Sequence, residues 1–319
     1  MNWIKKGKVF DTTRQDLPLG CTSFAQSPQT LILEDRVRVY FSSRKTDPIH
    51  GKFLSHICFV DFDLGFEQIL GTNTDPIIPL GELGCFDEHG IFPISITQHQ
   101  DRILAYTCGW NRRSSVSVDT STGLAESHDG GVHFEKIGNG PVLSATLHEP
   151  MLVGDSFVRV YQGVWHMWYI FGQRWLPATA IEPPARVYKI AHAVSEDGIH
   201  WKKNDGVAIL PDALNRDECQ ALPSVAFFNE KYHMVFCYRE ATDFRTNPKR
   251  GYRLGYAWST GLAQWHRDDQ FVDLAAVEND WDFEMQCYPH FFVLNNQLHL
   301  LYNGNQFGKN GFGLAILKP

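Results

Sequence analysis

The segment YHMVFCYRE, from Tyr232 to Glu240, reads as a β-strand with an aromatic residue, Phe236, at its centre. Four other segments match it without gaps: RVRVYFSSR from Arg36, RILAYTCGW from Arg102, WHMWYIFGQ from Trp165 and LHLLYNGNQ from Leu298. The aligned aromatic residues follow one another at steps of 66, 63, 67 and 66 residues: Tyr40, Tyr106, Tyr169, Phe236 and Tyr302. A period of this length indicates a fivefold internal repeat.

Each repeat contains the pattern of four strands. In PSVAFFNEKYHMVFCY, from Pro223, two apolar runs flank an Asn-Glu turn, as in a β-hairpin. A third run follows the hairpin in four units: HICFVDFDLGF, GLAESHDGGVHF, IAHAVSEDGIHW and GYAWSTGLAQW. A fourth is seen in WKKNDGVAIL, from Trp201. Four-stranded units in tandem predict an all-β fold, a five-bladed β-propeller.

The last unit lacks a fourth strand, because only GFGLAIL (311–317) follows its hairpin. The N-terminal stretch WIKKGKVFD (3–11) resembles WKKNDGVAI, so we expect it to complete the last blade and remove an exposed sheet edge. The expected organisation is a single domain over residues 1–319. Its blades are expected at 22–80, 88–143, 151–210, 218–274, and 284–317 together with 3–11.

Composition narrows the functional classes. The chain has 319 residues, 43% of them hydrophobic, which is enough for one large core, and a net charge of −7 without a basic stripe, which argues against nucleic acid. No apolar run has the length of a membrane span or the form of a signal peptide, so we expect a cytoplasmic protein. Seven cysteines without a CxxC pair fit reduced thiols, and we expect neither a cofactor nor a metal.

Chemistry is expected at one mouth of the propeller axis, where residues before each first strand and after each second strand converge. Three glutamates lie five residues ahead of a strand-opening proline: Glu88, Glu218 and Glu284. Repeated carboxylates can cap a turn in each blade. They can also form the pair that glycoside chemistry needs, one protonated and one ionised.

The same two columns contain polar residues that could bind a substrate: Arg44, His89, Trp110, His148, Glu149, Gln173, Arg174, Gln220, Arg239, Glu240, Gln286, Asn303 and Asn305. The many arginines indicate an anionic sugar, such as a uronic, nonulosonic or phosphorylated one, unless each simply neutralises a nearby glutamate. His89 and His148 lack the spacing of metal ligands. The proline-rich segment 174–187 is expected to overhang the mouth as a stiff flap.

The turns SHDGGVHF (127–134) and SEDGIHW (195–201), with blade starts ending in proline, resemble those of the five-bladed propeller glycoside hydrolases. That group includes the family 43 arabinosidases and xylosidases, the family 32 fructosidases and the family 130 mannoside phosphorylases. The resemblance implies three acids at the mouth and a general acid just ahead of a first strand. Glu218, in DECQALPSV, matches that role, with Glu88 and Glu284 as its partners.

The first unit departs from this pattern, because GCTSFAQSP (20–28) has no acid nearer than Asp16. Two functions therefore stay open. One is a glycoside hydrolase-like enzyme acting on a small carbohydrate, and the other is a carbohydrate-binding propeller without catalysis. The sequence does not decide the oligomeric state.

Overall fold

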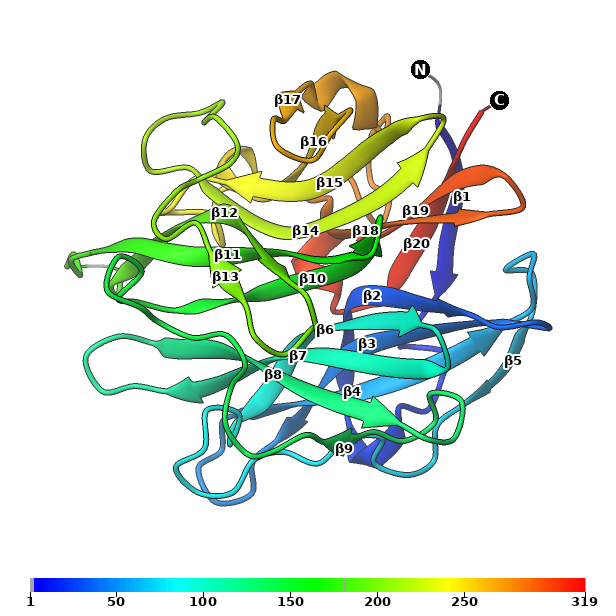
Figure 1. Ribbon diagram of the computed structural model, residues 1–319, viewed down its shortest axis with the longest axis horizontal. Helices are drawn as coiled ribbons and strands as arrows, with labels where there is room; N and C mark the ends of the chain where they lie inside the picture. The colour runs from blue at the N-terminus through cyan, green and yellow to red at the C-terminus, as the bar shows by residue number, and fades with distance from the viewer. Residues whose placement is uncertain (1–2, 181, 319) are drawn as a thin grey trace.

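The computed structural model describes residues 3–180 and 182–318, and it is all-β (Figure 1). Three four-stranded antiparallel sheets are present. One contains β10 (Val153–Tyr161), β11 (Val164–Leu176), β12 (Ala185–Ser195) and β13 (Lys202–Lys203). The next contains β14 (Cys219–Phe228), β15 (Lys231–Arg239), β16 (Arg253–Ser259) and β17 (His266–Arg267). The third contains β18 (Cys287–Leu294), β19 (Gln297–Asn303), β20 (Phe312–Leu317) and β1 (Trp3–Phe10).

Eight further strands form two antiparallel groups. The first group is β2 (Ser23–Ile32), β3 (Val37–Thr46), β4 (Phe53–Phe62) and β5 (Ile69–Thr72). The second is β6 (Gly90–His99), β7 (Arg102–Arg112), β8 (Val118–Ser127) and β9 (Glu135–Lys136). A single parallel pair, Ser55 with Gly90, joins the groups into one sheet. The helical elements are short: η1 (Pro18–Gly20), η2 (Pro248–Arg250), η3 (Asp269–Val272) and α1 (Asn305–Gly308).

The first strands of these groups pack around a common centre. β2 contacts β6, β6 contacts β10, β10 contacts β14, β14 contacts β18, and β18 contacts β2 again. The groups are accordingly arranged around the middle of the molecule in Figure 1. The N-terminal strand β1 pairs antiparallel with β20, from Trp3 opposite Leu317 to Phe10 opposite Phe312. The pairing expected for the N-terminal strand is therefore confirmed.

The repeated aromatic residues are fully buried, and the hydroxyls of the first two, Tyr40 and Tyr106, tie neighbouring units together. Tyr40 donates a hydrogen bond to the carbonyl of Gly131 (2.6 Å), and Tyr106 donates one to Gly198 (2.9 Å). Gly198 is the glycine of the S-x-D-G turn of the following unit, and Gly131 directly follows the S-x-D-G turn of its unit. A Cβ at Gly131 would lie 2.4 Å from the Tyr40 hydroxyl, so this turn requires glycine. The motif that carries the family resemblance therefore packs one unit against the next.

A buried ion pair recurs in four units, between an acid ahead of the first strand and a cation of the fourth strand. The pairs are Asp87 with Lys136 (2.6 Å), Glu149 with Lys203 (2.7 Å), Glu218 with Arg267 (2.7 Å) and Asp282 with Lys5 (2.8 Å). All four acids are at most 1% exposed. Because Lys5 lies on β1, the N-terminal strand supplies the cation of this pair, as the fourth strand does in the other three units.

No helix in the described ranges is long and apolar enough to cross a membrane. All seven cysteines are free thiols.

The Lys5–Asp282 pair gives a test of how the N-terminal strand β1 is held to the last group of strands. Lys5→Ala should lower the free energy of unfolding by about 3 kcal/mol, because it leaves a buried carboxylate without its cation. Lys6→Ala, which removes the exposed neighbouring charge, is the matched control and should change stability by less than about 0.5 kcal/mol. Urea unfolding of the three proteins measures both effects, and equal stability of the two variants would contradict the closure role of Lys5.

Candidate functional site

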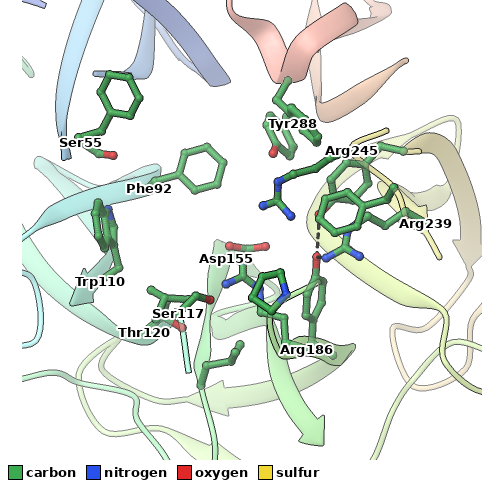
Figure 2. Close-up of a pocket in the computed structure, with 18 of the residues that line it drawn as sticks. Ser55, Phe92, Trp110, Ser117, Thr120, Asp155, Arg186, Arg239, Arg245 and Tyr288 are labelled. Carbon is green, nitrogen blue, oxygen red and sulfur yellow. Dashed lines mark hydrogen bonds between the residues drawn. The ribbon is translucent and has the colours of Figure 1, made fainter. Parts of the chain in front are cut away.

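A cavity of about 1320 Å³ opens at one end of the ring of first strands (Figure 2). Its wall is built from the starts of first strands, the ends of second strands and the loops that follow them. Pro183, Pro184 and Arg186 of the proline-rich segment also line it, so the expected flap does reach the mouth. Ile181, within that segment, lies outside the described residues.

Irregular pairing in the first strands directs side chains into this cavity. In β2 the register shift lies between Ser23 and Gln26, and Phe24 inside it lines the cavity. The other four units share this feature. The register shifts lie between Ile91 and Ile94 in β6, Gly154 and Phe157 in β10, Ala221 and Ser224 in β14, and Cys287 and His290 in β18. The residues inside these shifts that line the cavity are Phe92, Asp155, Leu222 and Tyr288. Such bulges re-aim side chains, and they commonly border active sites.

Asp155 is the acid among these four. Its backbone has a φ of 49°, a left-handed value that the bulge imposes. Burial raises the pKa of the Asp155 carboxyl to about 7, although Arg186 and the Leu222 backbone N–H act in the opposite direction. In the view of Figure 2 Asp155 lies centrally, with Phe92 and Trp110 on one side. A carboxyl with a pKa near neutrality can both give and take a proton at physiological pH.

Four arginines of the cavity wall have no carboxylate within 4.0 Å among the described residues: Arg44, Arg186, Arg239 and Arg245. Arg112 and Arg113, also on the wall, pair instead with Asp47 (3.5 Å) and Asp119 (2.9 Å). Neutralisation by a neighbouring acid therefore accounts for Arg112 and Arg113. It does not account for the other four.

Arg239 is 2% exposed, and neutral groups position it. Its guanidinium donates to the carbonyl of Glu240 (2.7 Å) and to the hydroxyl of Tyr188 (2.9 Å), which lies 2.6 Å from the hydroxyl of Tyr252. Its Nε has no hydrogen-bond partner. The ring of Phe244 packs against the guanidinium at 3.6 Å. The charge is thus held in place without being neutralised.

Glu218, the expected general acid, does not line the cavity. Its carboxylate accepts hydrogen bonds from Arg267 (2.7 Å), from Gln220 (3.0 Å) and from the backbone N–H of Ala213 (2.8 Å). Burial alone would raise the pKa of Glu218, but these donors outweigh it and lower the pKa. An ionised, fully hydrogen-bonded carboxylate is suited to holding the turn, so this geometry does not favour proton donation.

The other two glutamates also differ from the expected arrangement. Glu88 accepts a hydrogen bond from the backbone N–H of Gly84 (2.6 Å), lies 3.1 Å from His89, and is outside the cavity wall. Glu284 does line the cavity, at its exposed rim. Because only Glu284 of the three reaches the wall, the expected carboxylate cluster is not brought together.

Of the residues expected to bind substrate, three line the cavity: Arg44, Trp110 and Arg239. Ten lie outside its wall: His89, His148, Glu149, Gln173, Arg174, Gln220, Glu240, Gln286, Asn303 and Asn305. Several of these have structural partners. Asn303 bonds the backbone of Ala25 (2.7 Å), and Arg174 pairs with Asp217. Their polarity serves turns and strand ends rather than the cavity.

Within the described residues, no group of three or more His, Cys, Asp or Glu side chains could hold a metal ion. The cavity wall offers mainly guanidinium groups and aromatic rings, and these are not metal ligands.

Two Mycobacterium tuberculosis proteins match the whole chain over their own full length. The uncharacterized proteins MT1551 (strain CDC 1551) and Rv1502 (strain H37Rv) are each 32% identical to it over 327 residues. The chain belongs to their family. Comparison with protein-family models gave no match.

Solved structures with the same fold process glycosides. A thermostable family-43 glycoside hydrolase has a TM-score of 0.66 and 15% identity, covering 94% of this chain and 90% of its own. The β-1,2-mannobiose phosphorylase of Listeria innocua has a TM-score of 0.68 and 12% identity, covering 100% and 97%. The family-32 β-fructofuranosidase of Bombyx mori has a TM-score of 0.60 and 13% identity, covering 92% and 61%. The chain therefore has the all-β fold of these propeller enzymes, as its motifs indicated.

Two consequences of the site can be measured. Glu218→Gln should destabilise the protein by about 2 kcal/mol, because it removes a buried charged hydrogen bond and leaves Arg267 with Asp269 (3.0 Å) as its remaining anion. Urea unfolding gives the value, and Glu240→Gln, at a partly exposed acid nearby, is the control that should change stability little. Unchanged stability of Glu218→Gln would mean that the ion pair is not structural.

The raised pKa of Asp155 predicts a pH dependence of stability. The folded protein holds this proton up to about pH 7, while the unfolded chain releases it near 3.8. The contribution of Asp155 is therefore complete below about pH 4 and is lost as the pH rises to about 7. Wild type should lose stability relative to Asp155→Asn across that range in urea titrations. Parallel curves for the two proteins would mean that the carboxyl is ionised throughout.

Proposed function

We propose that the chain is a single five-bladed β-propeller domain that acts on a small, anionic glycosidic substrate in the cavity at its axial mouth. Five groups of strands, the ring of contacts between their first strands and the pairing of β1 with β20 support the blade count. Glycoside-processing enzymes with the same fold support the substrate class.

The observation that carries the proposal is the Asp155 carboxyl, with its pKa of about 7, in a cavity lined by four unpaired arginines. A protonated Asp155 gives its proton to the leaving oxygen of the glycosidic bond as that bond breaks. Arg44, Arg186, Arg239 and Arg245 bind the anionic group of the substrate and hold the bond beside Asp155.

Glu284 is the other carboxylate of the cavity wall. Its exposed position at the rim suits a group that accepts a proton from attacking water. Trp110 offers an aromatic face for a sugar ring, and its indole stacks on His89 at 5.8 Å. Glu218 and Glu88 have no catalytic part in this scheme, because their carboxylates serve the turns ahead of the first strands.

The alternative function, a carbohydrate-binding propeller without turnover, differs at one point. Both functions need the arginines, but only an enzyme needs the proton on Asp155. Asp155→Asn keeps the shape of the side chain while removing the transferable proton. The variant therefore separates the two functions.

For an enzyme, Asp155→Asn should lower kcat by about 10²–10⁴ and leave KM nearly unchanged. An aryl glycoside whose leaving group needs no protonation should lose much less. Steady-state kinetics on alkyl and aryl glycosides of acidic sugars measures both. Glu218→Gln, corrected for the folded fraction, is the control that should keep its kcat.

Full turnover of an alkyl glycoside by Asp155→Asn would reject Asp155 as the acid. If wild type turns over none of these glycosides, yet binds acidic sugars as tightly as Asp155→Asn does, the binding function stands instead.

A further inference from the structure

We propose that the arginine cluster of the cavity is a phosphoryl-binding subsite, so that the anion taken by this protein is a phosphate rather than a sugar carboxylate. This deepens the proposed function and rests on it for the choice of the cavity as the substrate site. The phosphoryl group has two possible sources, a phosphate ester of the sugar and free phosphate bound beside the sugar.

The charge of the cavity wall is the first argument. The wall carries eight cationic side chains: Arg44, Lys52, Arg112, Arg113, Arg186, Arg239, Arg245 and Lys309. The acids that line the same wall are two, Asp155 and Glu284, and Arg112 and Arg113 are the cations that also pair with acids outside it. The whole chain, by contrast, has a net charge of −7. Such a local reversal of charge marks a surface built for an anion.

The second argument is that three of the unpaired guanidinium groups, those of Arg44, Arg186 and Arg239, interact electrostatically with the fourth, Arg245. Burial and repulsion from Arg239 and Arg186 lower the pKa of Arg245, and Arg44 is likewise affected by burial and by Arg245. Like charges that share one cavity repel each other. An anion at their centre would remove that repulsion.

The third argument is that aromatic rings and phenols, rather than acids, hold the cluster. Phe244 packs against the guanidinium of Arg239 at 3.6 Å and that of Arg245 at 4.3 Å. The ring of Phe24 contacts Arg44 at 4.2 Å. Rings can orient guanidinium groups and leave their N–H donors available. The buried Nε of Arg239, which has no partner, is one such donor.

The magnitude of the charge separates phosphate from carboxylate. A sugar carboxylate carries one negative charge and two acceptor oxygens, so it can neutralise one arginine. A phosphate monoester carries about −1.5 to −2 at pH 7 and has three acceptor oxygens, which suit several planar guanidinium forks at once. With a pKa of about 7, Asp155 is ionised in only about half of the molecules at pH 7, so it offsets only part of the cluster's charge.

Calorimetric titration at constant ionic strength tests the subsite with four probes: inorganic phosphate, glucose 6-phosphate, glucuronate and glucose. Both phosphates should bind at least about tenfold more tightly than glucuronate, and glucose should bind most weakly. Arg245→Ala should weaken phosphate binding by about tenfold to a hundredfold. Arg245 is suitable for substitution because it lies on the loop between β15 and β16 and forms no ion pair with the described residues, so the variant should fold.

Arg113→Ala is the matched control, since Arg113 lines the same cavity but is paired with Asp119. It should leave phosphate affinity within about threefold of wild type. Arg245→Lys keeps the charge but loses the planar fork, and it should recover only part of the affinity. Equal losses in Arg113→Ala and Arg245→Ala would overturn the subsite, as would glucuronate binding as tightly as phosphate.

The two sources give different results, and both support the subsite. If glucose 6-phosphate binds at least about tenfold more tightly than inorganic phosphate, the phosphoryl group belongs to the sugar. If inorganic phosphate binds as tightly as glucose 6-phosphate, it is a separate ligand. Asp155→Asn should still bind phosphate, because it removes a carboxyl and no arginine. A failure of turnover with intact phosphate binding would thus count against the proposed catalysis alone.

Discussion

The fold depends on a repeated buried ion pair. In four units, an acid just ahead of the first strand reaches a lysine or arginine on the fourth strand, so it ties the inner edge of the group to its outer edge. The pair formed by Asp282 and Lys5 does this across the two ends of the chain. A buried charge that lost its partner would be strongly destabilising, so the residue types at both ends of each pair are constrained. The first unit has neither an acid between Asp16 and Glu34 nor this pair.

This constraint explains why the repeated glutamates were misleading. Sequence spacing aligned Glu218 with Glu88 and Glu284. In the structure, Glu218 instead takes the place in the ion pair that Asp87 and Asp282 take in their units. The loops ahead of the first strands differ in length by one or two residues, which shifts the acid relative to the proline. A carboxylate that recurs in unit after unit serves what the units have in common, and that is their folding.

The architecture was predictable because its signals are local and periodic. Hairpins, the fourth strand supplied by the N-terminus and the buried tyrosines all follow from runs of residues that repeat. The aromatic-x-cation pattern of Trp3–Lys5, Phe134–Lys136, Trp201–Lys203 and Trp265–Arg267 was also present in the sequence, and it would have identified the cations of the ion pairs. Arg44 and Arg239 could be assigned to the mouth because each follows a second strand. Arg186 lies in the proline-rich segment that is expected at the mouth, but neither Arg186 nor Arg245 stands out in the sequence, because both come from segments without a period.

Asp155 shows where a site can be sought in a repetitive chain. From Phe92 to Asp155, Leu222 and Tyr288 the steps are 63, 67 and 66 residues, the same as the steps between the buried aromatic residues. Three of these four positions carry large apolar side chains before a proline, and the fourth carries an acid before Ser156. Repetition supplies the bulge that aims each side chain into the cavity. The apolar neighbours then exclude water and raise the pKa of the one carboxyl among them. The proposed proton donor of the cavity therefore lies where the repeat is broken, on a backbone that the repeat has already shaped.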